Sequence, residues 1–244
     1  MADANRKQFA TEDLGILFRA LDQSGSPCVL MGGQAVNFWA FGNLMAGQFA
    51  FALGTDQLKI EVLRKVPGLK DAELLRLTTQ ERAGGHTIRV LNPLGVLLAK
   101  TWNVVNIKKE GRHDAEQLLA MIPCVRAYIR EFMREGESDE RVLRAGLNLI
   151  KATLAFTETR VAAGAAARCG VDWAQVLPHA HIAQSALPEL ARFRELAAPR
   201  WLAKVATYKR AFPEGSAVLR LLEILACHAE PLCAQPCARI RPSP

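Results

Sequence analysis

The sequence predicts an α+β fold in which a small mixed β-sheet with flanking helices is followed by a helical C-terminal half. Three observations support this prediction. An apolar segment at residues 29–31 runs into a Gly-Gly pair and then into helical spacing. The segment at residues 59–63 alternates and is rich in β-branched residues, which is typical of a strand, and a second strand is expected at residues 86–91. From residue 93 onward, apolar residues recur almost throughout at helical spacing.

The composition bounds the class of protein. The 244 residues suffice for one large domain or two small ones, and half of them are apolar, which is enough to build a core. No uninterrupted apolar run reaches about 18 residues, so we expect no membrane span. The first residues lack the apolar core of a signal peptide, so we expect a cytoplasmic protein. The formal net charge of +7 suits a nucleotide or nucleic-acid partner, but ordinary solubility explains it equally well.

The N-terminal region is predicted to form a helix and then the strand, turn and helix around which the chain is organised. Thr11 can cap a helix over residues 12–23. The next apolar segment reads VLMGGQAVNFW, in which Gly32 and Gly33 allow the backbone a positive φ. Gln34 begins a helix whose first amides have no internal partners and carry the positive end of its dipole. A phosphate fits there; the alternative is a purely structural turn.

A turn, a short helix and a strand complete the predicted α/β region. Residues 66–69 read VPGL and are expected to form the turn, and residues 71–77 the short helix. Two glycines then lead into the strand at residues 86–91. Asn92 is the predicted cap of the next helix and Pro93 its first residue, because proline is favoured at that position. This helix is expected to end at about residue 107.

Helices are predicted to fill most of the remainder. We expect them at residues 114–121, 123–134, 139–166 and 216–229. Asp114 caps the first of these, Pro123 opens the second and Gly170 ends the third, after which Asp172 caps a further segment. The predicted domains are an α/β domain at residues 1–110, a helical region at 111–230 and a disordered, proline-rich tail at 231–244.

Four segments in this order resemble bacterial proteins of the nucleotidyltransferase superfamily, which has the polymerase-β-like fold. They read VLMGGQAVNFWA, KIEVLRKVPGL, IRVLNPLGVLLAKTWNV and KKEGRHDAEQLLAMIPCVRAYIREF. Within this superfamily they resemble the AbiEii-type and the GGQA nucleotidyltransferase-like proteins, and the resemblance covers about residues 12–135. It implies a nucleotidyltransferase-like domain at residues 1–110, a nucleoside triphosphate (NTP) substrate and Mg²⁺ as cofactor. It also raises a role in a toxin–antitoxin pair, with a cognate antitoxin protein as a partner.

The resemblance also implies particular site residues. The Gly-Gly turn, with Gly32, Gly33 and Gln34, would cradle the triphosphate. Three carboxylates in this family hold two Mg²⁺ ions, which activate the attacking oxygen and stabilise the leaving pyrophosphate. Glu61 falls where the third carboxylate is expected, so it is the candidate catalytic residue and metal ligand. Asp56 is a second candidate ligand, whereas the usual Asp-x-Asp pair has no counterpart in the sequence.

A basic loop follows the helix that begins at Pro93. It contains Lys109 and Arg112, which in a nucleotidyltransferase would contact the triphosphate or an RNA backbone. The alternative is a solvated loop between two helices. Lys100 lies in the helix that precedes this loop, close to Trp102. It faces either a cleft or solvent, and the sequence does not decide between the two.

Three functions are therefore compatible with the sequence. The first is a Mg²⁺-dependent enzyme that transfers a nucleoside monophosphate from NTP to an unknown acceptor, with activity impaired or lost because two of three metal carboxylates are not found. The second is a non-catalytic module that binds a nucleotide, RNA or a partner protein. The third is a helical scaffold whose Gly-Gly turn is only structural.

Overall fold

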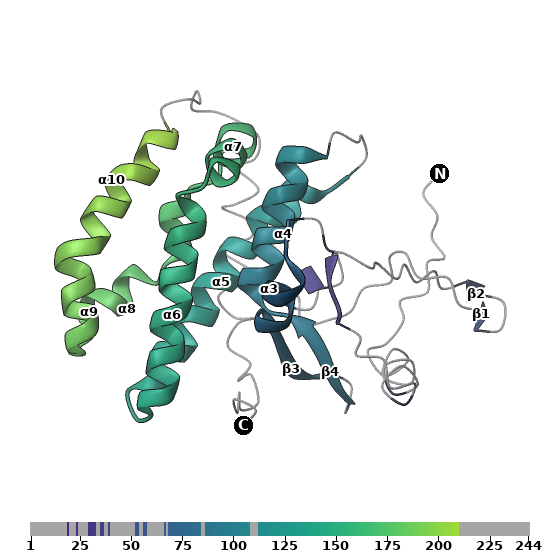
Figure 1. The fold of residues 1–244 in the computed structure, drawn as a ribbon, viewed down its shortest axis with the longest axis horizontal. Helices are drawn as coiled ribbons and strands as arrows, with labels where there is room; N and C mark the ends of the chain where they lie inside the picture. Colours follow the sequence, from purple (N-terminus) through teal and green to yellow (C-terminus); the bar gives the residue numbers. More distant parts are fainter. Residues whose placement is uncertain are drawn as a thin grey trace. The chain divides into compact units, whose positions relative to one another are not determined.

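The described part of the chain is mostly helical, with a small amount of antiparallel β-structure (Figure 1). The computed structural model describes residues 19, 23, 29–32, 35–36, 39, 52–53, 56–57, 66, 68–83, 86–107 and 112–209. Described residues up to Ala99 belong to one compact unit and those from Lys100 onward to a second. The division falls within helix α4 (Pro93–Asn106).

The first unit contains a β-hairpin of strands β3 (Thr78–Ala83) and β4 (His86–Leu91). The strands pair antiparallel, from Thr78 opposite Leu91 to Ala83 opposite His86. Strand β4 confirms the strand predicted at residues 86–91. Strand β3 was not predicted, because its sequence, TTQERA, is polar and lacks an apolar alternation. Outside these strands, Leu30 forms one isolated parallel bridge with Val90.

A second, very short hairpin lies earlier in the chain. Strand β1 (Ala52–Leu53) pairs antiparallel with strand β2 (Asp56–Gln57), with Leu53 opposite Asp56. No regular pattern in this glycine-rich stretch predicts a strand. Two residues separate the paired strands, which is the commonest length of a hairpin connection.

The turn, short helix and cap predicted before α4 are all present. Leu69 N donates to Val66 O at 3.1 Å, and Gly68 has a φ of +83°. A type II turn favours proline at its second position and needs a positive φ, usually from glycine, at its third. The sequence VPGL has this pattern. Helix α3 (Asp71–Arg76) follows. Asn92 Oδ1 accepts from Gly95 N at 2.9 Å, which confirms Asn92 as the cap of α4.

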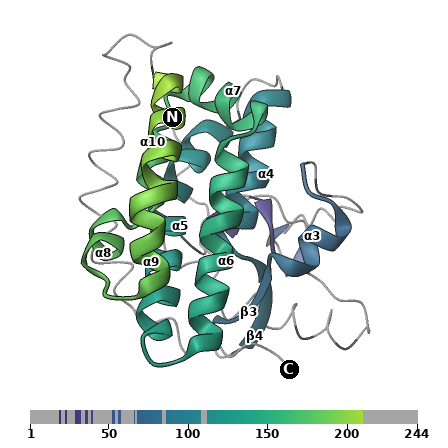
Figure 2. The same ribbon diagram turned by 60° about the vertical axis from the view of Figure 1, so that its left-hand side comes forward.

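The second unit is a set of helices packed around α5 and α6 (Figure 2). Its elements after α4 are α5 (Asp114–Gly136), α6 (Glu140–Thr157), α7 (Arg160–Cys169), the 3-10 helix η1 (Trp173–Val176), α8 (His179–Gln184), α9 (Pro188–Arg192), the π-helix η2 (Phe193–Ala197) and α10 (Ala198–Lys209). A short connection makes α5 and α6 antiparallel neighbours, and α10 packs against α7 and η1.

Large apolar side chains and two indole hydrogen bonds hold these helices together. Fully buried residues include Leu118, Met121, Ile129 and Met133 of α5, with Ile150 of α6. Trp173 Nε1 donates to Ala162 O at 2.9 Å, and Trp201 Nε1 donates to Thr157 Oγ1 at 2.8 Å. Each bond satisfies the polar end of a buried indole, so the ring adds apolar burial without an unpaired donor.

Two predictions about α5 were wrong. The N-cap is His113, and the Asp114 carboxylate bonds to neighbouring side chains instead of capping the helix. Pro123 lies inside one continuous helix of 23 residues and does not open a second one. A proline there removes one helical hydrogen bond. The helix continues because the residues on both sides of Pro123, such as Ile122 and Cys124, are buried.

The helix predicted at residues 139–166 is also corrected, because it is two helices. Asp139 Oδ1 accepts from Arg141 N at 2.8 Å and caps α6, which ends at Thr157. Thr159 then caps α7, accepting from Ala162 N at 3.2 Å. The predicted end at Gly170 is confirmed, with a φ of +67° in the left-handed region that glycine favours. Asp172 caps η1, as predicted.

Several predictions lie outside the described residues: the strand at residues 59–63, the helix at residues 216–229 and the tail at residues 231–244. Of the helix predicted at residues 12–23, only Arg19 and Gln23 are described, and both are helical. Among the helices that the structure describes, none combines the length and the apolar character that crossing a membrane requires.

Candidate functional site

The Gly-Gly turn begins beside strand β4. Leu30 N donates to Arg89 O at 2.8 Å, and Leu91 N donates to Leu30 O at 3.0 Å. These two bonds hold Leu30 parallel to β4, two residues before Gly32. The short apolar segment predicted as a strand is therefore paired, although only through this single bridge.

Gly32 has the backbone conformation that the sequence predicts for the turn. Its φ is +69°, which an L side chain rarely adopts. A β-carbon placed on Gly32 would meet nothing within 4 Å. The backbone conformation therefore favours glycine here, and crowding around the residue does not. The open space beside the backbone is what a ligand approaching this turn needs.

Helical residues after the turn are attached to the first unit by burial and by one side-chain hydrogen bond. Ala35 and Val36 are helical and fully buried. Trp39 is helical as well, and its Nε1 donates to Leu91 O at 2.8 Å. Trp39 therefore attaches this part of the chain to the end of β4. Gly33 and Gln34, the other two predicted members of the cradle, lie outside the described residues.

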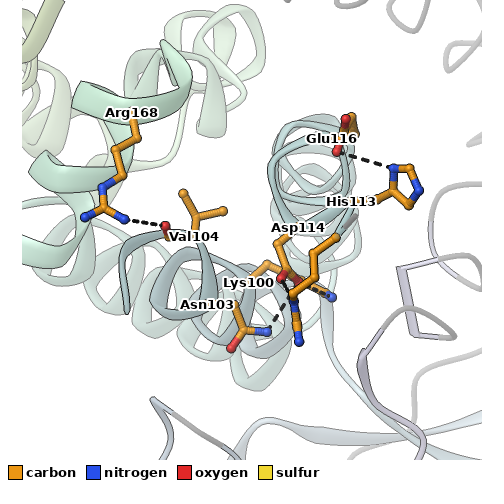
Figure 3. Close-up of polar contacts among 8 residues, drawn as sticks. Lys100, Asn103, Val104, His113, Asp114, Glu116 and Arg168 are labelled. Atoms are coloured by element: carbon orange, nitrogen blue, oxygen red, sulfur yellow. Dashed lines mark hydrogen bonds and ion pairs between the residues drawn. The ribbon is translucent and has the colours of Figure 1, made fainter. Parts of the chain in front are cut away.

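A buried ionic cluster lies in the second unit (Figure 3). Lys100 Nζ donates to Asp114 Oδ1 at 2.9 Å, and both side chains are almost fully buried. Arg112 Nε donates to Asp114 Oδ2 from a half-exposed position. Asn103 Nδ2 approaches Asp114 Oδ1 at 3.4 Å. A single carboxylate thus joins the C-terminal half of α4 to the start of α5, and two cations share it.

The charges of this cluster alter the pKa values of its members. Burial by itself would raise the pKa of Asp114, but the hydrogen bonds from Arg112 and Lys100 and the attraction of their charges outweigh it and lower the pKa to about 2. Burial lowers the pKa of Lys100, while the bond to Asp114 and its charge act in the opposite direction. Asp114 is therefore a carboxylate at neutral pH and neutralises one of its two cations.

The predicted site residues are placed as follows. Gly32 belongs to the first unit and Arg112 to the second. Arg112 was predicted to contact phosphate, and it bonds to Asp114. Lys100, whose surroundings the sequence left open, is buried against the same carboxylate. Asp56 lies in β2, where only its backbone is described, and Glu61 and Lys109 lie outside the described residues.

Two further contacts surround the cluster in Figure 3. His113 Nδ1 lies 3.8 Å from Glu116 Oε2 on the exposed first turn of α5. Arg168 Nη1 donates to Val104 O at 2.9 Å and thereby joins the last turn of α7 to α4. The first contact follows the i,i+3 spacing of a helix, whereas the second joins residues 64 positions apart and has no signal in the sequence.

The described carboxylates do not form a metal site. Within the described ranges, no three His, Cys, Asp or Glu side chains lie together as a metal ion would require. Both carboxylate oxygens of Asp114 already bond to cations, one to Lys100 and the other to Arg112. A carboxylate committed to two cations is a poor ligand for a third.

Comparisons of the chain with protein-family models, with curated proteins and with solved structures gave no match.

Proposed function

We propose that the chain is a nucleotidyltransferase-like protein that binds a nucleoside triphosphate at the Gly-Gly turn and whose transfer activity is impaired or lost. One observation carries the proposal. Gly32 combines a positive φ with open space beside it, directly after a segment paired to β4 and before a helical segment. A strand, a glycine turn and a helix start in this order form a common arrangement for binding a phosphate through backbone amides.

The transfer chemistry would need Mg²⁺ held by carboxylates, with Glu61 and Asp56 as the candidate ligands. Such ions activate the attacking oxygen and stabilise the leaving pyrophosphate. The sequence lacks the Asp-x-Asp pair that the resembled family uses for most of this binding. Impaired transfer to the unknown acceptor follows, because the two-metal arrangement works only when both ions are placed.

The alternative is a non-catalytic module on the same fold, which binds a nucleotide, RNA or a cognate antitoxin protein without releasing pyrophosphate. The ionic cluster favours a structural role for at least one predicted phosphate ligand. Arg112 is bonded to Asp114 across two residues, so a triphosphate would have to compete with that carboxylate for its guanidinium. The basic loop would therefore contribute less to the affinity for a triphosphate than the sequence alone predicts.

Binding and transfer are tested together with α-labelled NTPs, Mg²⁺ and either total RNA or the protein itself as acceptor. The matched variants are Gly32→Asp and Gly32→Asn, which have the same shape and differ in charge. Asn tolerates the left-handed region better than most residues, and a β-carbon on Gly32 would meet nothing within 4 Å. We expect NTP binding to the wild-type protein and to Gly32→Asn, and a loss of at least about tenfold for Gly32→Asp, since its carboxylate repels the triphosphate.

Label transfer abolished by Gly32→Asp would establish an active enzyme. Mg²⁺-dependent binding without transfer would support the impaired or non-catalytic form. Equal binding by both variants, or no binding by the wild-type protein, would contradict nucleotide binding at this turn and leave it a structural feature.

A further inference from the structure

We propose that the exposed face of helix α6 binds the phosphate backbone of a nucleic-acid duplex. This face, called the α6 face below, consists of six exposed residues: Arg141, Arg144, Ala145, Asn148, Lys151 and Ala152. The proposal does not depend on nucleotide binding at Gly32, because it concerns other residues and a different ligand.

The six residues form one continuous surface. They recur at helical spacing, so they lie within one side of α6. The opposite side, with Leu143, Gly146 and Ile150, is buried. In Figure 2, α6 runs beside α10 and in front of α5. From Arg141 to Lys151 the face is about 15 Å long, at a rise of about 1.5 Å per residue.

The charge on this face is mostly positive. Helix α6 contains three cations, Arg141, Arg144 and Lys151, and one acid, Glu140, which borders the face four residues before Arg144. In the described part of the chain, the side chains of Arg141 and Lys151 form no ion pair. Arg144 pairs with Glu140 at 2.8 Å, but both groups are highly exposed. Such a pair contributes little free energy and gives way easily to a stronger partner.

The chemistry of the face favours nucleic acid over protein. Protein interfaces depend on aromatic and large apolar anchors in their centres. The α6 face offers only arginine, lysine, asparagine and alanine. Interfaces with nucleic acid are polar and positively charged, and arginine, lysine and asparagine are usual donors to phosphate oxygens. Ala145 and Ala152 have small side chains and lie beside the cations, so a nucleic-acid backbone can approach the helix closely.

The same composition favours a duplex over a single strand. Proteins that bind single strands stack the bases on aromatic side chains, and the α6 face has none. A duplex exposes a regular row of phosphates and requires no stacking. Binding should therefore be independent of base sequence and strongly dependent on salt.

The test uses two triple variants of the full chain. The α6-face variant carries Arg141→Gln, Arg144→Gln and Lys151→Gln. The control variant carries Arg160→Gln, Arg192→Gln and Arg200→Gln, three exposed cations on other helices. Each removes three positive charges, so each lowers the formal net charge from +7 to +4. Circular dichroism melts check that both are folded; exposed glutamine in a helix costs only a few tenths of a kcal/mol.

Binding is measured by fluorescence anisotropy with labelled RNA and DNA duplexes of about 20 base pairs, from about 50 to 200 mM salt. We expect the wild-type protein and the control variant to bind with similar affinity. The α6-face variant should bind at least about tenfold more weakly. Its slope of log K against log salt should be smaller by roughly three units, one for each lost phosphate contact.

Four outcomes would overturn the proposal. These are no duplex binding by the wild-type protein at low salt, equal weakening by both triple variants, tighter binding to the corresponding single strand, and equally tight binding to polyglutamate. The last would assign the face to an acidic protein partner.

Discussion

Asp114 has an unusual position for a carboxylate, because it is buried between two cations. The cost of removing its charge from water is met by Lys100 and Arg112, which both bond to it. Lys100 depends more than Arg112 does on the bond to Asp114. It is buried and bonds to Asp114, whereas the half-exposed Arg112 retains access to water.

Replacing one partner of this buried pair should therefore lower the free energy of unfolding strongly. Replacing both partners should lower it much less. We expect Asp114→Asn to lower the free energy of unfolding by about 3 kcal/mol, because Lys100 would be left charged and unpaired. A double variant, Lys100→Met with Asp114→Asn, should recover most of that loss. Urea titrations of the wild type, both single variants and the double variant measure these values, and additive losses would contradict the pairing.

The pH dependence of stability checks the same pair. The pKa of Asp114 falls from its ordinary 3.8 to about 2 on folding. Its contribution, roughly 2 kcal/mol, is therefore present above about pH 4 and lost as the pH falls towards about 2. The Asp114→Asn variant should lack this acid-induced loss. An unchanged acid transition in that variant would show that other carboxylates cause it.

Glu81 shows the opposite effect on β3. It lies opposite Ile88 in the hairpin and is buried, so burial raises the pKa of its carboxyl above the ordinary 4.5, while the bond from Thr79 acts the other way. Glu81 therefore contributes most to stability below about pH 4.5, and this contribution is lost as the pH rises through its raised pKa.

We therefore expect Glu81→Gln to stabilise the protein by about 1 kcal/mol at pH 7. Glutamine keeps an oxygen that can accept from Thr79 and carries no charge to bury. The gain should fade on acidification to about pH 4, where the wild-type carboxyl is protonated as well. Chemical denaturation at both pH values measures this, and a destabilised variant at pH 7 would contradict it.

At the scale of elements, Gly136 sets how closely α5 and α6 approach. A β-carbon on Gly136 would lie 2.7 Å from Leu143 Cα and 2.8 Å from Leu143 N. These are backbone atoms, so the helix itself would have to move. Gly164 in α7 is different, because a β-carbon there would contact only the Val105 side chain, at 3.4 Å.

The same substitution should thus have opposite effects at the two positions. Gly136→Ala should cost about 2 kcal/mol, because the clash exceeds the gain in helix propensity. Gly164→Ala should gain up to about 1 kcal/mol from propensity alone. Thermal melts followed by circular dichroism compare the two, and a stabilised Gly136→Ala would show that α6 can shift without cost.

The elements that the sequence predicted are those with local signals. Strand β4, helix α3 and the Asn92 cap are each marked by apolar or capping residues within a few positions. Strand β3 has no such pattern, and the pairing with β4 imposes its structure. The helix break before Thr159 was missed because the apolar spacing continues across it.

The candidate site was predictable only in part, for a related reason. The positive φ of Gly32 follows from a local pattern, the glycine pair after an apolar segment. The pairing of Lys100 with Asp114 joins residues 14 positions apart on different helices. Spacing along the chain does not reveal such a contact, because it depends on how α4 and α5 pack. A capping role for Asp114 was the local interpretation, and tertiary packing overrode it.

At the scale of the whole molecule, each unit has its own set of buried residues. The first includes Ile88, Val90 and Leu91 with the N-terminal half of α4, and the second is built around α5 and α6. Helix α4 begins in one unit and ends in the other. Units with separate cores can unfold separately, in which case a single free energy of unfolding does not describe the chain.

Two glycine substitutions, one in each unit, distinguish separate from joint unfolding. A β-carbon on Gly95 would lie 2.7 Å from the Leu91 side chain, which is fully buried and cannot turn away. We expect Gly95→Ala to reduce amide hydrogen-exchange protection in β3 and β4 and to leave α5 and α6 protected. Gly136→Ala should do the reverse. If either variant lowered protection equally in all four elements, the two cores would form one cooperative unit, and the stability effects of Asp114 and Glu81 would have to be read from a single transition.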